Sequence, residues 1–177
     1  PKGVMIAHRA MIAEFRALDE MFSFGPAEHS LCFLPLSHAL ERAWSAYLWS
    51  HGCMSTHVTD TRRIAEMMAL ARPTMMVAVP KLYETVMAGA RAEAGDTGPR
   101  RRLFDWSLGV GATVQAAYNR GERPPLRDRL RLLVADRLVL GRIRAAIGGP
   151  KRMLVSGGAP LSREVQSFFG AAGLHIL

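Results

Sequence analysis

Hydrophobic residues along this chain follow two spacings that alternate with each other. From residue 7 to residue 22 apolar side chains recur at helical spacing, which predicts an amphipathic helix. These positions are Met11, Ile12, Phe15, Leu18 and Phe22. The next apolar run, over 31–36, is short and is interrupted by a proline, which is typical of a buried strand.

Helix and strand patterns keep alternating to the end of the chain. Further helices are predicted over 39–52, 62–71, 81–94 and 162–173, and further strands over 53–58, 74–79, 152–156 and 174–177. A mainly helical stretch from about 100 to 147 interrupts this order. Because parallel strands need a crossover element between them, the alternation predicts an α/β fold: a mostly parallel sheet with helices on its faces and a helical insertion.

Four loops would share one edge of such a sheet. In a parallel sheet the loops that follow the strands emerge together at the carboxyl edge, where ligands bind. The loops expected there span 35–38, 57–60, 79–81 and 156–160. His38 follows the first strand and would lie at this edge, although a lone histidine after a strand often has only a structural role. Both interpretations of His38 stay open at this point.

Composition narrows the class of protein. The chain has 177 residues, of which 49% are hydrophobic and 21% are charged, which is enough for one substantial core and argues against intrinsic disorder. Cys32 and Cys53 follow neither metal-ligand nor disulfide spacing, which favours a reducing, cytoplasmic location. The sequence has no apolar run long enough to span a membrane, and its first residues do not follow the order of a signal peptide.

Positive charge is concentrated in one part of the chain. The net charge is +8, and much of the excess lies between Arg100 and Arg152. Such density fits nucleic acid, an anionic membrane surface, a phosphate-bearing ligand or simply a solvated face. The arginines alternate with leucine, valine and isoleucine at helical spacing, which disfavours nucleic acid and favours the solvent side of amphipathic helices.

Four segments of the chain carry short sequence motifs. They are PKGVMIAHR (1–9), LPLSHALER (34–42), RPTMMVAVPKLYETV (72–86) and MLVSGGAPLSREVQSFF (153–169). In this order they resemble the adenylate-forming acyl-CoA synthetases, and within that family the long-chain fatty acid branch. The resemblance implies that the chain is part of the AMP-binding N-terminal domain of a longer protein, with the helical insertion at about 100–147 and without the C-terminal domain.

The resemblance implies a nucleotide site in two parts. Its residues are Lys2, Gly3, Gly157, Gly158, Ala159 and Pro160. Backbone N–H groups of a glycine-rich loop can approach phosphate oxygens closely, and Lys2 would add charge. The 157–160 turn has no bulky side chain, which suits contact with a flat purine ring. The alternative is an ordinary strand-to-helix turn in which Ser162 caps the next helix.

The resemblance also assigns His38, Val79 and Pro80 to the fatty acid site. His38 would orient the substrate carboxylate near the mouth of an acyl tunnel, and the other two residues would line that tunnel.

The sequence does not decide which residue gates this tunnel. Some relatives have a gating tryptophan four residues after the histidine, where this chain has Arg42. Arg42, Trp44 or neither would gate the tunnel. Trp44 is also suited to packing on the apolar face of its helix, and Glu41 and Arg42 are equally suited to a surface ion pair.

The family reaction has two steps. A fatty acid carboxylate attacks ATP to give an acyl-adenylate and pyrophosphate, and the thiol of CoA then displaces AMP. The expected ligands are therefore a long-chain fatty acid, ATP, Mg²⁺ and CoA, with no nucleic acid and with peripheral membrane association through the basic helices as a further expectation. No catalytic residue or metal ligand is assigned within the chain, which alone is expected to be inactive.

Two alternatives to this function stay open. One is another adenylate-forming enzyme, an acyl-AMP or aryl-CoA ligase, which would share the fold and the first step. The other is a non-catalytic basic domain that binds nucleic acid, for which steeply salt-dependent retention on DNA would be the sign.

Overall fold

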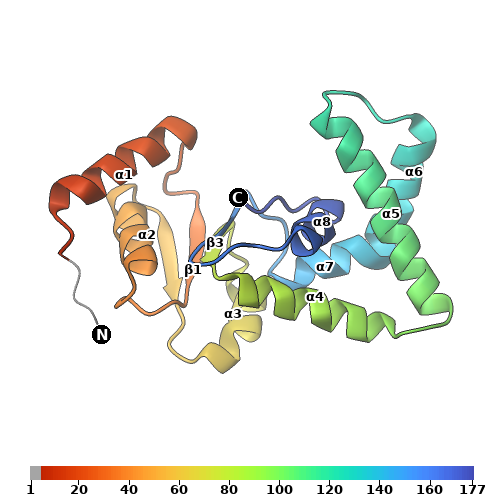
Figure 1. Cartoon of the computed structure of the whole chain (residues 1–177), viewed down its shortest axis with the longest axis horizontal. Coiled ribbons are helices and arrows are strands. Elements are labelled where there is room, and N and C mark those ends of the chain that lie inside the picture. The colour runs from red at the N-terminus through yellow and green to blue at the C-terminus, as the bar shows by residue number, and fades with distance from the viewer. Residues whose placement is uncertain (1–4) are drawn as a thin grey trace.

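A four-stranded parallel sheet forms the centre of the protein (Figure 1). The computed structural model describes residues 5–177. The strands are β1 (His29–Cys32), β2 (Met54–His57), β3 (Met75–Ala78) and β4 (Met153–Ser156), and their order across the sheet is β2-β1-β3-β4. All three strand pairings are parallel. The α/β fold with a parallel sheet that the sequence predicts is therefore confirmed.

Helices connect the strands and make up most of the remaining structure. They are α1 (His8–Met21), α2 (Ala39–Ser50), η1 (Thr61–Arg63), α3 (Ile64–Ala71), α4 (Pro80–Ala94), α5 (Pro99–Asn119), α6 (Leu126–Ala135), η2 (Asp136–Leu140), α7 (Gly141–Ala146) and α8 (Arg163–Ala171). The helices α5 to α7 and η2, which is a π-helix, occupy the stretch that was expected to be helical over about 100–147.

The two faces of the sheet are covered by different helices. Met75 and Val77 point toward one face, where they pack with Trp44, Tyr47 and other residues of α1 and α2. Met76 and Ala78 point toward the opposite face, which α3, α4, α7 and α8 cover. Successive side chains of a strand alternate between faces, so β3, buried along its whole length, contributes to both cores.

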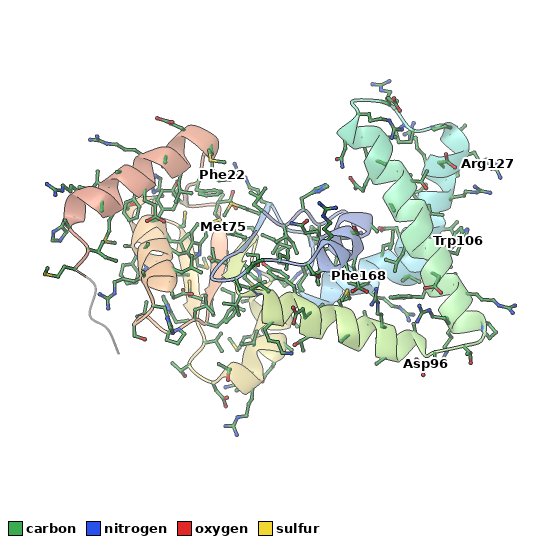
Figure 2. The ribbon with its side chains drawn as sticks, in the orientation of Figure 1. Phe22, Met75, Asp96, Trp106, Arg127 and Phe168 are labelled. Atoms are coloured by element: carbon green, nitrogen blue, oxygen red, sulfur yellow. The ribbon has the colours of Figure 1, made fainter. Side chains whose placement is uncertain are left out.

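The helices α5 and α6 extend away from the sheet as an arm (Figure 1). The arm is anchored where α5 crosses α8, and Phe104 of α5 packs there with Phe168 of α8, their ring centroids 6.3 Å apart. Gly111 makes this crossing close, because a Cβ atom at that position would lie only 2.0 Å from the carbonyl oxygen of Ala171. Figure 2 shows Arg127, on α6, at the far side of the molecule from Met75 in the sheet.

The amino edge of the sheet is held by a polar network. The carboxylate of Glu28 is buried and accepts a hydrogen bond of 2.6 Å from the hydroxyl of Thr74. The same carboxylate forms an ion pair with Arg152. Arg152 also donates to the carbonyl oxygen of Ser23 at 2.7 Å and lies 5.7 Å from the centre of the Phe24 ring. These contacts join the segments that lead into β1, β3 and β4.

Three predictions of local structure need correction. The first strand spans His29–Cys32 and not 31–36, because the N–H of Leu34 donates to the side chain of Glu41 at 3.2 Å and not to a neighbouring strand. The helix predicted over 39–52 ends at Ser50. The last residues do not form a full strand: a single bridge joins Ile176 to β4.

Candidate functional site

The carboxyl ends of the strands lie together, as the sequence predicts. Cys32 pairs with His57 across β1 and β2, and Ala78 pairs with Ser156 across β3 and β4. The N–H of Gly157 donates to the carbonyl oxygen of Ala78 at 3.0 Å, which extends the last pairing by one residue into the loop. The four predicted loops therefore leave the sheet at one edge, the carboxyl edge.

The glycine turn lies close to two neighbouring segments at this edge. A Cβ atom on Gly157 would lie 2.9 Å from a methyl group of Leu40, in the first turn of α2. A Cβ atom on Gly158 would lie 3.8 Å from a methyl group of Val79. Gly158 has a φ of +84°, a conformation that glycine adopts far more readily than other residues. The glycine turn therefore fits against both the start of α2 and the end of β3.

His38 lies at the carboxyl edge with its side chain exposed to solvent. It is the N-cap residue of α2, but its side chain makes no capping hydrogen bond. Its backbone N–H donates to the carbonyl oxygen of Pro35 at 2.9 Å, which closes a turn. Arg42 supports this turn, because its Nε donates to the carbonyl oxygen of Leu36 at 3.1 Å. The imidazole is thus held on a defined turn while its ring remains accessible.

Glu41 supports the same turn from its buried side, a position that the sequence did not predict. Only 1% of Glu41 is exposed, so the surface ion pair with Arg42, one of the alternatives that the sequence left open, is wrong. Its carboxylate accepts hydrogen bonds from the N–H of Leu34 at 3.2 Å and from the hydroxyl of Ser45 at 3.3 Å. Burial raises the pKa of Glu41 above its ordinary value. Because glutamate is rarely fully buried, the sequence carried no signal for this contact.

The thiol of Cys32 lies beside this carboxylate. Burial, followed by the nearby charge of Glu41, raises the pKa of Cys32 to about 12. Cys32 and Cys53 are both free and buried. A thiol with so high a pKa is a poor nucleophile, so Cys32 acts as a packing residue.

Trp44 belongs to the core and not to the edge. It is buried against Tyr47 and Phe24, and its indole N–H donates to the hydroxyl of Ser30 on β1 at 3.0 Å. This arrangement matches the packing role considered for Trp44. Arg42, by contrast, is exposed beside the His38 turn.

Val79 and Pro80 form the junction between β3 and α4. Val79 is half-buried and is the N-cap residue of α4, while Pro80 is the first helical residue and is buried. Proline suits that position because its missing N–H would have no partner inside the helix. The hydroxyl of Tyr83, one turn later, donates to the carbonyl oxygen of Val155 at 3.0 Å and fixes α4 against β4.

The remaining residues of the predicted nucleotide site fall into two groups. Ala159 and Pro160 are exposed beside the glycine turn. The hydroxyl of Ser162 accepts a hydrogen bond from the N–H of Val165 at 3.2 Å. Ser162 therefore caps α8, as expected for an ordinary strand-to-helix turn. This cap fixes the end of the turn and leaves Gly157 to Pro160 available for a ligand. Lys2 and Gly3 lie outside the described residues.

Two surface hollows lie away from this edge. One lies between α5 and α6 beside Trp106 and Arg131, and the other lies between α5 and α8 beside Phe168. Neither is lined by a residue of the predicted site. Within residues 5–177, no helix has both the length and the apolar character needed to cross a bilayer.

Comparison with known proteins identifies the family. Residues 1–176 match the family described as AMP-binding enzyme. Over 99% of its length the chain is 33% identical to the long-chain-fatty-acid–CoA ligase FadD15 of Mycobacterium tuberculosis, of which it covers 29%. Over 95% of its length it is 31% identical to the peroxisomal long chain acyl-CoA synthetase 6 of Arabidopsis thaliana, of which it covers 23%. The chain thus spans less than a third of the length of these relatives.

Solved structures agree on the fold. The A-PCP didomain of the carboxylic acid reductase of Segniliparus rugosus, solved in complex with AMP, aligns with a TM-score of 0.59 at 21% identity, over 99% of this chain and 21% of that one. The adenylation domain of a carboxylate reductase of Mycobacterium chelonae aligns with a TM-score of 0.54 over 94% of this chain. The fold, the motifs at the carboxyl edge and the match over 1–176 show that the chain belongs to the AMP-binding, adenylate-forming enzyme family.

Proposed function

We propose that this chain is part of the AMP-binding domain of a longer protein that activates long-chain fatty acids as acyl-CoA thioesters. The observation that carries the proposal is the 33% identity over 99% of the chain to a relative named as a long-chain-fatty-acid–CoA ligase. The close approach of three motif-bearing segments at the carboxyl edge supports it, because that edge is where parallel α/β sheets bind ligands.

The residues at this edge have distinct roles in the proposal. The turn from Gly157 to Pro160 presents backbone and small side chains to the adenine of ATP, because larger side chains would fill the space against Leu40. His38, held on its turn, orients the fatty acid carboxylate toward the α-phosphate. The carboxylate is ionised at neutral pH, so the step needs positioning more than it needs a general base.

The acyl chain would leave this junction along the end of β3. Val79 and the buried Pro80 form an apolar boundary next to the glycine turn, which suits the first methylene groups of the substrate. Arg42, exposed on the first turn of α2, remains a candidate for the gate, whereas the burial of Trp44 counts against that residue. Magnesium and CoA enter the proposal from the family reaction, and no residue of this chain is assigned to them.

Two assays on the full-length protein test this proposal. The first measures fatty acid-dependent exchange of pyrophosphate into ATP, which reports adenylation, and the second measures formation of the CoA thioester. We expect both activities with long-chain fatty acids. Exchange without thioester would favour an acyl-AMP ligase or a related adenylating enzyme. Absence of both activities, with salt-sensitive retention on DNA, would favour the nucleic-acid-binding alternative.

The variant His38→Ala tests the assignment of the site within this reaction. Because the ring is exposed, the free energy of unfolding should change by less than about 0.5 kcal/mol. Loss of an orienting group should lower kcat/KM for the fatty acid by about 10- to 100-fold. Asp96→Ala, in the exposed loop between α4 and α5, is the control and should leave both quantities unchanged. Full activity of His38→Ala would remove His38 from the site.

A further inference from the structure

The helix α6 exposes apolar side chains on the face that is turned away from the core. Leu126 is 68% exposed, Leu130 54% and Leu133 66%. At 3.6 residues per turn these three side chains fall within an arc of roughly 60°. Val134 and Leu138 continue the exposed apolar surface toward η2. We call the group of Leu126, Leu130 and Leu133 the leucine stripe.

The leucine stripe is separate from the face that α6 uses for folding. Ala135 is fully buried and Leu132 packs against the main core, both on the opposite side of the helix. The helix thus has two apolar faces, and folding of residues 5–177 uses only one of them. Three large leucines close together in solvent form an apolar patch of the kind that marks interaction sites.

Arginines flank the leucine stripe on both sides. On the helical wheel Arg129 lies beside one edge of the stripe and Arg127 beside the other. Arg131 pairs with Asp128 at 3.7 Å, whereas within residues 5–177 neither Arg127 nor Arg129 has an ion-pair partner. Figure 2 shows Arg127 at the outer side of the arm, where a large flat surface could approach it.

We propose that α6 docks on the surface of an anionic lipid bilayer, with the leucine stripe inserted among the acyl chains and the flanking arginines at the phosphate groups. A helix with leucines on one side and arginines at the borders of that side is the pattern of an interfacial, membrane-surface helix. The charge of Arg127 and Arg129 selects an anionic surface and disfavours a second copy of this basic chain as the occupant. The arm places the stripe away from the carboxyl edge, so docking would leave the site open.

The test is sedimentation of the full-length protein with vesicles. One set consists of phosphatidylcholine alone, and the other contains about 30% phosphatidylglycerol, a charge fraction that attracts basic segments. We expect binding to the anionic set that weakens as salt rises. In the double variant Leu130→Ser/Leu133→Ser the partition coefficient for the vesicles should fall about 10-fold or more, because two apolar side chains that would be transferred from water into the bilayer are absent. In Arg127→Gln/Arg129→Gln the preference for anionic vesicles should fall about 10-fold.

Matched controls come from other exposed positions. Leu70→Ser removes an equally exposed leucine, 68%, from α3, and Arg9→Gln/Arg16→Gln removes the same charge from α1. Both should bind vesicles as the unaltered protein does. Thioester formation from detergent-dispersed fatty acid should be the same in all variants, so failure of docking is distinguishable from failure of the proposed function.

Several outcomes would overturn the proposal. Absence of vesicle binding, or equal binding by the leucine variant and the control, would remove α6 as the docking element. A clear drop in the urea midpoint of unfolding for Leu130→Ser/Leu133→Ser in the full-length protein would show that another segment of that protein covers the stripe. Retention on DNA that depends on Arg127 and Arg129, with unchanged vesicle binding, would assign the arginines to nucleic acid.

Discussion

The two edges of the sheet differ in how their residues are held. At the amino edge, the buried carboxylate of Glu28 is satisfied by Thr74 and Arg152, and side chains join three strand entries to one another. At the carboxyl edge, His38 and the 158–160 turn are exposed, and the His38 turn is held by the buried Glu41 and by the exposed Arg42. The difference indicates that the amino edge contributes stability, whereas the carboxyl edge keeps polar groups free for a ligand.

Removing the arginine of the amino edge should have the largest effect on stability. Arg152→Ala leaves the buried Glu28 without its cation, and we expect the free energy of unfolding to fall by about 2–3 kcal/mol. This is less than for a fully buried pair because Arg152 is half-exposed and water can partly replace it. Urea unfolding of the full-length protein measures the change, and activity per folded molecule should be unaltered.

Arg120→Ala is the control for that experiment. It breaks the exposed pair of Arg120 with Glu122, whose N–O distance is 2.8 Å, and should leave the urea midpoint of unfolding almost unchanged. If Arg152→Ala and Arg120→Ala lower stability equally, the amino edge is not the stabilising edge.

A methyl group at the glycine turn should affect binding more than stability. In Gly157→Ala the new Cβ would lie 2.9 Å from Leu40, whose flexible end can shift, so the loss of stability should stay near 1 kcal/mol. The shifted Leu40 would enter the space proposed for ATP, and we expect KM for ATP to rise about 10-fold. Steady-state kinetics measure this rise.

Gly89→Ala provides the matched change inside a helix. Gly89 has open space around its Cα, and alanine there should stabilise α4 by roughly 0.5–1 kcal/mol without changing KM. An unchanged KM in Gly157→Ala would place the nucleotide elsewhere.

The smallest effect on stability is expected for Glu41, beneath the His38 turn, and this effect depends on pH. Burial raises the pKa of Glu41 above 4.5, so the folded protein holds this proton more tightly than the unfolded chain does. The contribution of Glu41 to stability is therefore complete below pH 4.5 and declines as pH rises through the raised pKa.

Glu41→Gln tests this interpretation. The amide oxygen can still accept from Leu34, and the side chain carries no charge, so we expect stability at pH 8 to rise by about 1 kcal/mol while at pH 4 it hardly changes. Unfolding measured across this range should show the difference between the variant and the unaltered protein growing with pH. Glu41→Leu, which removes the acceptor, should be less stable than Glu41→Gln at every pH.

Local signals in the sequence located most of the elements. Pro80 at the start of α4 and Ser162 at the cap of α8 lie where their chemistry predicts, and the all-apolar β3 is buried on both faces. The first strand was predicted over 31–36 because Phe33 and Leu34 are apolar, but these two residues do not take part in the hydrogen bonding of the sheet. The chemical reason is that the side chain of Glu41 accepts a hydrogen bond from the N–H of Leu34.

The candidate site was only partly predictable. His38 and the glycine turn could be placed at one edge from the order of helices and strands. The burial of Glu41 could not, because glutamate is rarely found fully buried and its partners are a backbone group and a hydroxyl. The leucine stripe was not predicted either: the alternation of arginine and leucine indicated a single solvent side rich in arginine, whereas α6 has leucines on both sides.

The pairing of β3 with β4 has a consequence for synthesis on the ribosome. Strand β3 ends at Ala78, but its neighbour β4 begins only at Met153. At ordinary rates of translation β3 would wait roughly 4 to 15 seconds for this neighbour, with one edge unpaired. Its apolar, uncharged sequence, TMMVAV, is of the kind that aggregates in such an interval. The nascent chain therefore carries an unpaired apolar strand edge while the helices α4 to α7 are being made, and slowing translation there should increase its dependence on chaperones.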